Sequence, residues 1–194
     1  MNMLRMCFPC GARVGSSAVA IVHSSIGFTV RHLMVSKVHG RFSQWSGSLE
    51  FDEQDPGASR VRVSIDAASI DTREAPRDAH LRSPDFLDAE HFPHIEFTST
   101  SVTRASAGEL HVTGDLTIRG VTRTVQLDAE YAGRVKDPWG GERFGFSAKT
   151  TIKRSDFGLK WNQALEAGGV VVGDRMEISL EIEAVRHVAR AAAA

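Results

Sequence analysis

Apolar and polar residues alternate along most of the chain from about residue 24 onward. Successive side chains of a strand point to opposite faces, so a period of two indicates strands with one buried face. In the clearest series, residues 176–183, apolar side chains alternate with Glu or Ser. Further series with the same period occupy residues 26–30, 37–51, 61–65, 95–97, 110–118, 125–131 and 144–152.

These strand segments predict a closed, all-β fold. Turn sequences such as Asp55-Pro56-Gly57 and Arg119-Gly120 separate them, which favours antiparallel pairing of consecutive strands. An antiparallel meander buries one face and removes its exposed edges by curling into a barrel. We therefore predict a barrel of about eight antiparallel strands, whose interior is either filled by side chains or holds one small ligand.

Two segments without the alternation predict short helical insertions, near residues 71–93 and 161–168. In the first, Asp71 or Thr72 suits a helix N-cap, Pro76 suits a first turn, and Ser83-Pro84 suits the end. In the second, WNQALEA at 161–167 precedes Gly168-Gly169, a typical helix stop. An insertion of about twenty residues between strands exceeds an ordinary loop and is typical of a lid, a mouth or a binding loop.

Length and charge indicate one domain without a preference for charged partners. A chain of 194 residues suits a single domain, predicted here as a barrel over 22–187 between a poorly ordered 1–21 and a disordered tail at 188–194. The 23 Lys and Arg nearly balance the 24 Asp and Glu, which argues against nucleic acid as a partner. No apolar run reaches the length of a transmembrane segment.

The N-terminal segment predicts neither a redox centre nor a secretory signal. Cys7 and Cys10 lack the flanking strand and helix of a thioredoxin-like motif, and a frayed terminus is the simpler interpretation. Polar residues, one proline and two glycines interrupt the apolar run of residues 1–22, so a cytoplasmic location is expected.

The chain shows no constellation typical of catalysis or of a metal site. Gly-x-Ser-x-Gly, the P-loop and the dinucleotide fingerprint are all missing from the sequence, so we expect no catalytic residues, no cofactor and no enzyme. His80, His91 and His94 are close in sequence, but the extended Pro93 before His94 argues against convergence of their rings. No metal is expected.

Four motifs resemble one known family. HSSIGFTVRHLMVSKVHGRF at 23–42, RDAHLRSPDFLDAEHFPHIEF at 77–97, LTIRGVTRTV at 116–125 and IKRSDFGL at 152–159 resemble the YceI-like family, often called polyisoprenoid-binding proteins. The resemblance covers roughly residues 22–185. It implies an eight-stranded antiparallel lipocalin-like β-barrel, often a homodimer, whose apolar interior binds or transports a polyprenyl chain or a quinone. Many relatives are periplasmic.

One departure from the family pattern lies upstream of His23. Relatives usually begin their first strand with the type Trp-x-Ile-Asp-Pro-Ala, whereas residues 17–22 here read Ser-Ala-Val-Ala-Ile-Val. Residues 19–22 are the predicted replacement strand.

Alternation and the resemblance together give a set of candidate lipid-binding residues. The apolar candidates are Phe28, Val30, Phe42, Trp45, Ile65, Leu81, Phe86, Phe97, Leu116, Phe146 and Leu180. The polar candidates are His32, Arg77, Asp78, His80 and Arg154, and a cation among them could meet a phosphate or a quinone oxygen. An equally open interpretation is structural: Arg77 with Asp78, or Arg154 with Asp156, would tie the lid to the rim.

Burial energetics favour a long tunnel. One five-carbon isoprene unit contributes on the order of 3 to 4 kcal/mol when buried. Association costs about 4 to 15 kcal/mol, so several units must be enclosed. Three alternatives remain open from sequence: a solid core without a cavity, an enzyme acting on a bound isoprenoid, and a ligand-free structural or stress-response dimer.

Overall fold

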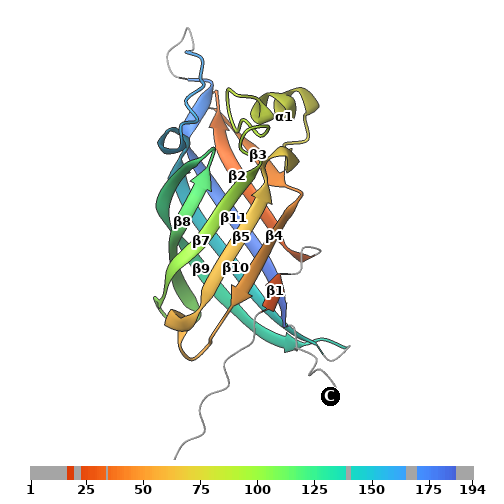
Figure 1. Ribbon diagram of the computed structural model, residues 1–194, viewed down its shortest axis with the longest axis vertical. Helices are drawn as coiled ribbons and strands as arrows, with labels where there is room; N and C mark the ends of the chain where they lie inside the picture. Colours follow the sequence, from red (N-terminus) through yellow and green to blue (C-terminus); the bar gives the residue numbers. More distant parts are fainter. Residues whose placement is uncertain (1–16, 20–22, 34, 139–140, 165–169, 187–194) are drawn as a thin grey trace, which may run out of the picture.

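The computed structural model describes residues 17–19, 23–33, 35–138, 141–164 and 170–186. They form one antiparallel sheet, one α-helix and three 3-10 helices (Figure 1). The strands are β1 (Ser17–Val19), β2 (Ser25–His32), β3 (Ser36–Phe42), β4 (Trp45–Glu50), β5 (Arg60–Asp66), β6 (Ile70–Asp71), β7 (His94–Arg104), β8 (Glu109–Ile118), β9 (Val121–Lys136), β10 (Glu142–Lys153) and β11 (Val172–Arg186). The helices are η2 (Pro56–Ala58), η3 (Ala67–Ser69), α1 (Ala75–Arg82) and η4 (Arg154–Phe157).

The sheet closes into a barrel through its first strand. Its order is β1-β4-β5-β7-β8-β9-β10-β11-β2-β3-β6, and β1 also pairs with β11. β1 and β2 both pair with β11, β3 continues into β4, and β5 continues into β6, so these eleven segments correspond to eight strands, three of them broken. The predicted all-β antiparallel barrel is confirmed, although the sheet is divided into eleven strand segments where eight strands were predicted.

Side chain and backbone contacts explain the strand breaks. The predicted strand over 37–51 is divided after Phe42, where Ser43 N donates to Ser69 O at 3.1 Å and Asp66 N donates to Gln44 O at 3.0 Å. The Asp66 carboxylate accepts from Ala68 N, which caps η3 and ends β5. These turns change the course of the first strands near one end of the barrel.

The first strand begins earlier than the sequence predicts. β1 covers Ser17–Val19, inside the segment 1–21 assigned to a poorly ordered end. It pairs with β4 and β11, so it supplies the edge for which 19–22 were predicted. Residues 20–22, the two cysteines and the tail at 188–194 lie outside the described residues.

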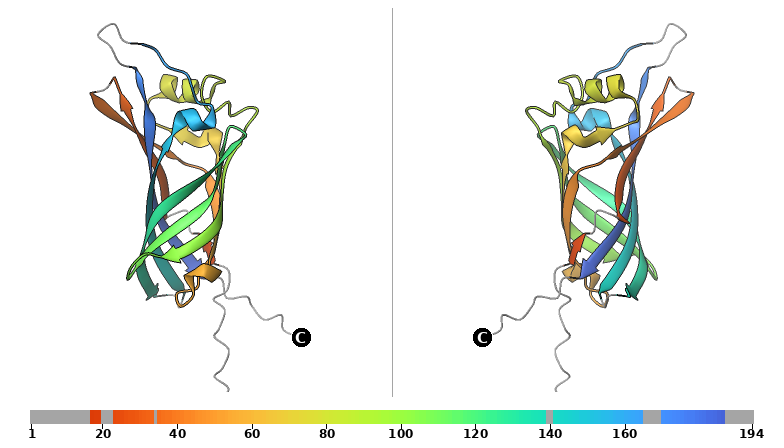
Figure 2. Two further views of the ribbon diagram at one scale, coloured as in Figure 1. Left: turned by 90° about the vertical axis from the view of Figure 1, so that its left-hand side faces the viewer. Right: turned by 90° about the vertical axis from the view of Figure 1, so that its right-hand side faces the viewer.

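The predicted first insertion forms α1, which lies across one end of the barrel in Figures 1 and 2. Pro76 lies in the first turn and the helix ends at Arg82, as expected. The predicted cap is wrong: the Glu74 carboxylate accepts from Arg77 N at 2.8 Å. Asp71 instead accepts from Arg73 N, two residues on, which delays the helix start.

The predicted helix near 161–168 is wrong over its described part, since 161–164 contain no helix and Ala164 forms a β-bridge with Val170. The Asn162 side chain pairs with the Val172 backbone, donating to its O at 2.8 Å and accepting from its N at 3.0 Å. The Asn162 side chain thus forms the two hydrogen bonds that a neighbouring strand would form with Val172, and it holds residues 161–164 extended. Residues 165–168 lie outside the described residues.

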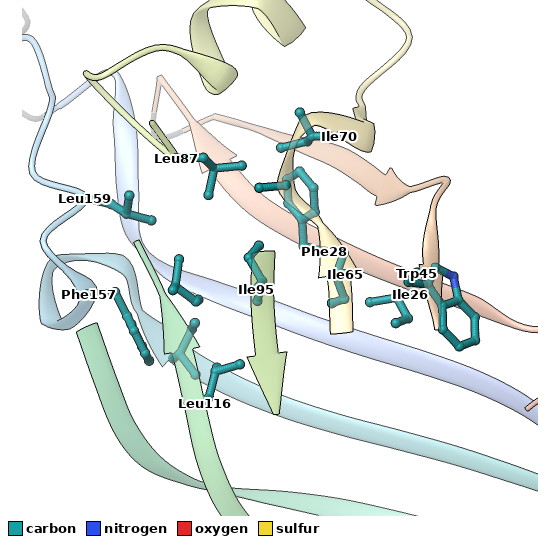
Figure 3. Close-up of a cluster of buried hydrophobic side chains, with 13 residues drawn as sticks. Ile26, Phe28, Trp45, Ile65, Ile70, Leu87, Ile95, Leu116, Phe157 and Leu159 are labelled. Carbon is teal, nitrogen blue, oxygen red and sulfur yellow. The ribbon is translucent and has the colours of Figure 1, made fainter. Parts of the chain in front are cut away.

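Buried side chains of the described residues form two apolar clusters in the interior. The first lies beneath α1 and includes Ile26, Phe28, Trp45 and Phe157, shown in Figure 3 with side chains from several strands converging. The second lies at the opposite end and is formed by Leu49, Phe51, Leu110, Phe144 and Ala184. Among the described helices, none has the length and apolar character needed to span a membrane.

Candidate functional site

An elongated apolar cavity runs inside the barrel from the end that α1 covers to the second apolar cluster, at the opposite end. Its volume is about 240 Å³, and its accessible wall is hydrocarbon. Inward positions of the strands line it, together with Leu81, Phe86 and Leu87 from α1 and the following turns. We call the segment 75–93 the lid. The cavity is the space that the inward-facing side chains of opposite strands leave open along part of the barrel axis.

Every apolar candidate from the sequence lies on this wall. They are Phe28, Val30, Phe42, Trp45, Ile65, Leu81, Phe86, Phe97, Leu116, Phe146 and Leu180. The sequence reasoning omitted further wall residues from its candidates, among them Leu49, Phe51, Val102, Leu110, Leu159 and Met176. Leu110 and Met176 belong to series with period two, so alternation alone would have found them.

Aromatic side chains join the lid to the loop after η4. The His80 ring meets Phe86 and Trp161 edge to face at centroid distances of 5.0 and 4.8 Å, and Phe86 lies 5.2 Å from Trp161. His80 Nε2 pairs with Asp85 Oδ2 at 2.9 Å. His80 is therefore part of the lid packing, and it is not on the cavity wall.

Arg77 and Asp78 anchor the lid through Thr72. Thr72 donates from its backbone N and its hydroxyl to Asp78 Oδ1, at 2.9 and 2.5 Å. Arg77 Nε donates to the same hydroxyl at 2.7 Å, and Arg77 Nη2 donates to Thr72 O at 2.8 Å. The sequence predicted a direct ion pair between Arg77 and Asp78, but the structure shows a hydrogen-bond network in which both side chains bind Thr72. Neither Arg77 nor Asp78 lines the cavity.

Arg154 is buried, and backbone carbonyls satisfy it. Its guanidinium donates to the O atoms of Gly173, Leu159, Trp161 and Val172, at 3.0, 2.5, 2.9 and 3.4 Å. Burial lowers the pKa of Arg154, and the charge of Asp174 opposes that shift. Arg154 lines the cavity, but its guanidinium is bonded to carbonyls of the segment after η4 and of the start of β11. A pair with Asp156 is not formed.

The last polar candidate, His32, ends β2 beside the cavity without lining it. It is paired in register with Ser36 and Val172. Its carbonyl accepts from Val35 N and from the Ser36 hydroxyl, both at 3.2 Å. His32 thus shapes the end of the β2–β3 hairpin.

The lid histidines do not converge. His91 Nδ1 pairs with Asp88 Oδ1 at 2.8 Å, whereas His80 pairs with Asp85. The hydrogen bond to Asp88 raises the pKa of His91 above its usual 6.5, and the charges of Asp88 and Glu90 add to it. Among the described residues no cluster of His, Cys, Asp and Glu could hold a metal ion.

Stacked aromatic rings occupy the end of the barrel opposite the lid. Phe51 lies 4.9 Å from Tyr131 and 5.0 Å from Phe146, and Tyr131 lies 5.1 Å from Phe146. Offset and edge-to-face aromatic packing of this kind adds to the stabilisation from burial. Of the three, Phe51 and Phe146 line the cavity at this end.

A closed antiparallel barrel with an internal apolar cavity and a helical lid defines a barrel of the ligand-binding type. The chain belongs to the YceI-like family, because the model of the YceI-like domain matches residues 18–184. The resemblance drawn from the four motifs is thereby confirmed.

Relatives and solved structures agree with this assignment. The chain is 46% identical to Protein YceI of Escherichia coli O157:H7 over 138 residues, which are 71% of this chain and 72% of that protein. The Campylobacter jejuni YceI crystal structure is 32% identical with a TM-score of 0.68, covering 81% of this chain and 90% of that one. A polyisoprenoid binding domain from Saccharophagus degradans shares the fold, with 16% identity, a TM-score of 0.65, and coverage of 90% and 99%.

Proposed function

We propose that this protein binds a polyisoprenoid-type amphiphilic lipid, a polyprenyl phosphate or a quinone, inside the barrel, and sequesters or transports it. The elongated apolar cavity of about 240 Å³ is the observation that carries the proposal. A ligand-free structural barrel would instead be packed across its axis, as protein interiors generally are. The polyisoprenoid-binding description of the Saccharophagus degradans domain supports the same ligand class.

The shape of the cavity suits a thread of apolar units. Its wall extends from Val30 and Leu159 beneath the lid to Phe51 and Phe146 at the other end. Each buried isoprene unit contributes on the order of 3 to 4 kcal/mol, and association costs about 4 to 15 kcal/mol. A chain of several units therefore binds usefully, whereas a single unit does not.

The lipid head group stays outside the apolar part of the cavity. Arg154 is the polar candidate that lines the cavity, but its guanidinium donates to four backbone carbonyl oxygens, two in the segment after η4 and two at the start of β11. Moving a charged phosphate into a hydrocarbon wall without a partner is unfavourable. The tail is thus recognised by the wall, and the head group remains at the mouth.

A non-enzymatic role and a homodimer complete the proposal. The side chains of Arg77, Asp78 and His80 are engaged in structural hydrogen bonds, which supports binding without chemistry. Turnover of a bound prenyl phosphate in a mass assay would contradict that role. Analytical ultracentrifugation tests the dimer, and cell fractionation tests the cytoplasmic location, which stays a prediction.

Native mass spectrometry of the purified protein tests the proposal most broadly. The expected result is a fraction carrying a mass equal to one long-chain isoprenoid or quinone, and uptake of added polyprenyl phosphate by the empty fraction. A protein that carries no such mass and takes up neither polyprenyl phosphate nor ubiquinone would refute it. Short prenyl alcohols, with too few units, serve as the negative control.

A further inference from the structure

The tip of the β2–β3 hairpin presents apolar side chains to solvent. Val35 is 84% exposed and Leu33 is 40% exposed. Among the described residues, Val135 is the one other large hydrophobic side chain that is exposed. We call Arg31, His32, Leu33, Val35, Ser36 and Lys37 the hairpin tip. Figure 2 shows β2 and β3 extending past the end of the barrel, beside the lid.

Backbone contacts hold the hairpin tip in place. Leu33 N donates to Val171 O at 2.8 Å, and Val35 N donates to His32 O at 3.2 Å. Leu33 has a φ of 50°, in the left-handed region, where a non-glycine residue is uncommon. Leu33 and Val35 are therefore both exposed at positions that backbone hydrogen bonds hold in place.

Cations flank these apolar side chains. Arg31 and Lys37 are both exposed and lie directly opposite each other in the β2–β3 register. Like charges in opposite positions are unfavourable without an anion nearby. Lys37 Nζ lies 3.4 Å from Glu177 Oε2 and forms an ion pair with it. Within the described ranges Arg31 makes no ion pair. The hairpin tip thus carries positive charge around an apolar point.

The hairpin tip continues one wall of the cavity. Val30 lines the cavity and directly precedes Arg31. Val172 also lines it and is the register partner of His32. A surface that contacts Leu33 and Val35 would therefore lie next to the lid end of the cavity.

We propose that the hairpin tip docks this protein on an anionic lipid bilayer. An apolar point inserts among the acyl chains at the interface while flanking cations meet the phosphates, the pattern of peripheral membrane anchors. Docking brings the lid end of the cavity to the bilayer, where a lipid can exchange. This purpose rests on the proposed function, but the docking itself does not depend on it.

Vesicle flotation tests the docking. Wild-type protein is expected to float with vesicles of phosphatidylcholine and phosphatidylglycerol in equal parts, more weakly with phosphatidylcholine alone, and less as salt screens the charges. Val35→Asp should weaken binding about tenfold, because an inserted valine is replaced by a charge. Arg31→Gln should weaken it about fivefold.

Val135→Asp is the matched control. Val135 is an exposed valine flanked by Arg134 and Lys136 at the C-terminal end of β9, and Figure 1 shows that end of β9 opposite α1. It should bind the mixed vesicles like wild type. Equal loss in both aspartate variants, or no loss in Val35→Asp, overturns the proposal.

Two further measurements separate the possible failures. Polyprenyl phosphate delivered in detergent should bind Val35→Asp as it binds wild type, so loss of docking is distinct from loss of the cavity. Sedimentation of both proteins tests whether a second copy of this chain occupies the hairpin tip instead. A dimer that dissociates in Val35→Asp while vesicle binding is unchanged would overturn the proposal in favour of that interface.

Discussion

The ring of Phe28 lies directly over Gly40, its partner across β2 and β3. A Cβ placed at Gly40 would lie 2.2 Å from Phe28 Cζ, far inside any normal contact. Phe28 lines the cavity, so the missing side chain at Gly40 is what lets this ring lie against the wall. A similar close approach occurs between β7 and β8, where Phe97 lies diagonally across from Gly114 and a Cβ at Gly114 would lie 2.5 Å from Phe97 Cζ. Glycine in a strand often marks such a close approach.

Gly40→Ala is expected to push the Phe28 ring into the cavity. Overpacking of this kind costs about 1 to 3 kcal/mol of unfolding free energy, and the displaced ring also shortens the space for a lipid tail. Urea unfolding and lipid titration measure the two effects. Gly145→Ala is the control, since a Cβ there meets only the Ala132 Cβ, at 3.4 Å. A Gly40→Ala protein with unchanged stability and affinity would show that the ring is not confined.

The apolar wall of the site could be predicted because all inward-facing side chains of a closed barrel share a single interior. With a period of two, each strand assigns alternate residues to the interior, and closure directs them to a common axis. Phe146 and Leu180, on β10 and β11, follow this alternation, and in the structure both line the cavity. Alternation does not say whether the interior is hollow. The resemblance to the YceI-like family supplied that expectation.

The polar part of the site could not be predicted, because its partners are backbone groups or distant residues. Arg154 meets four carbonyl oxygens, which leave no sequence signal, so a charged partner or a ligand looked equally reasonable. Asn162 imitates a strand by pairing with the Val172 backbone, whereas WNQALEA alone favours a helix. At Asn162 a tertiary contact thus overrode the local helix propensity.

The carboxylate of Asp78 is expected to keep the lid closed. Asp78→Ala leaves the Thr72 N–H and hydroxyl without their acceptor, at a cost of about 1 to 3 kcal/mol for a buried group. Hydrogen exchange in α1 should become faster, and a bound lipid should dissociate faster. Asp85→Ala removes a more exposed lid carboxylate and should change both rates little. Equal exchange in α1 of wild type and Asp78→Ala would argue against this anchor.

The lid should also respond to pH through His91. Its pKa is raised in the folded state, chiefly by the hydrogen bond to Asp88, so its stabilising contribution is complete below about 6.5, the usual pKa. That contribution is lost as pH rises through the raised folded pKa. Exchange at residues 83–92, corrected for intrinsic rates, should therefore be slower at acidic pH.

Two glutamine variants isolate this histidine. His91→Gln should remove the pH dependence of exchange in the lid, because its side chain does not titrate. His94→Gln, at an exposed position at the start of β7, should preserve it. A pH dependence that persists in His91→Gln would assign the effect to another group.

The hollow interior itself is tested by filling it. Ala148 lies on the cavity wall of β10, in register between Leu180 and Ala129, and Thr151 is exposed on the same strand. The most direct measurement is the affinity of Ala148→Trp for a long polyprenyl phosphate. Thr151→Trp and wild type are measured beside it, and melting curves are recorded for all three proteins. We predict a folded Ala148→Trp protein whose affinity falls about tenfold or more, with Thr151→Trp unchanged. Binding by folded Ala148→Trp as tight as wild type would contradict a lipid inside the barrel.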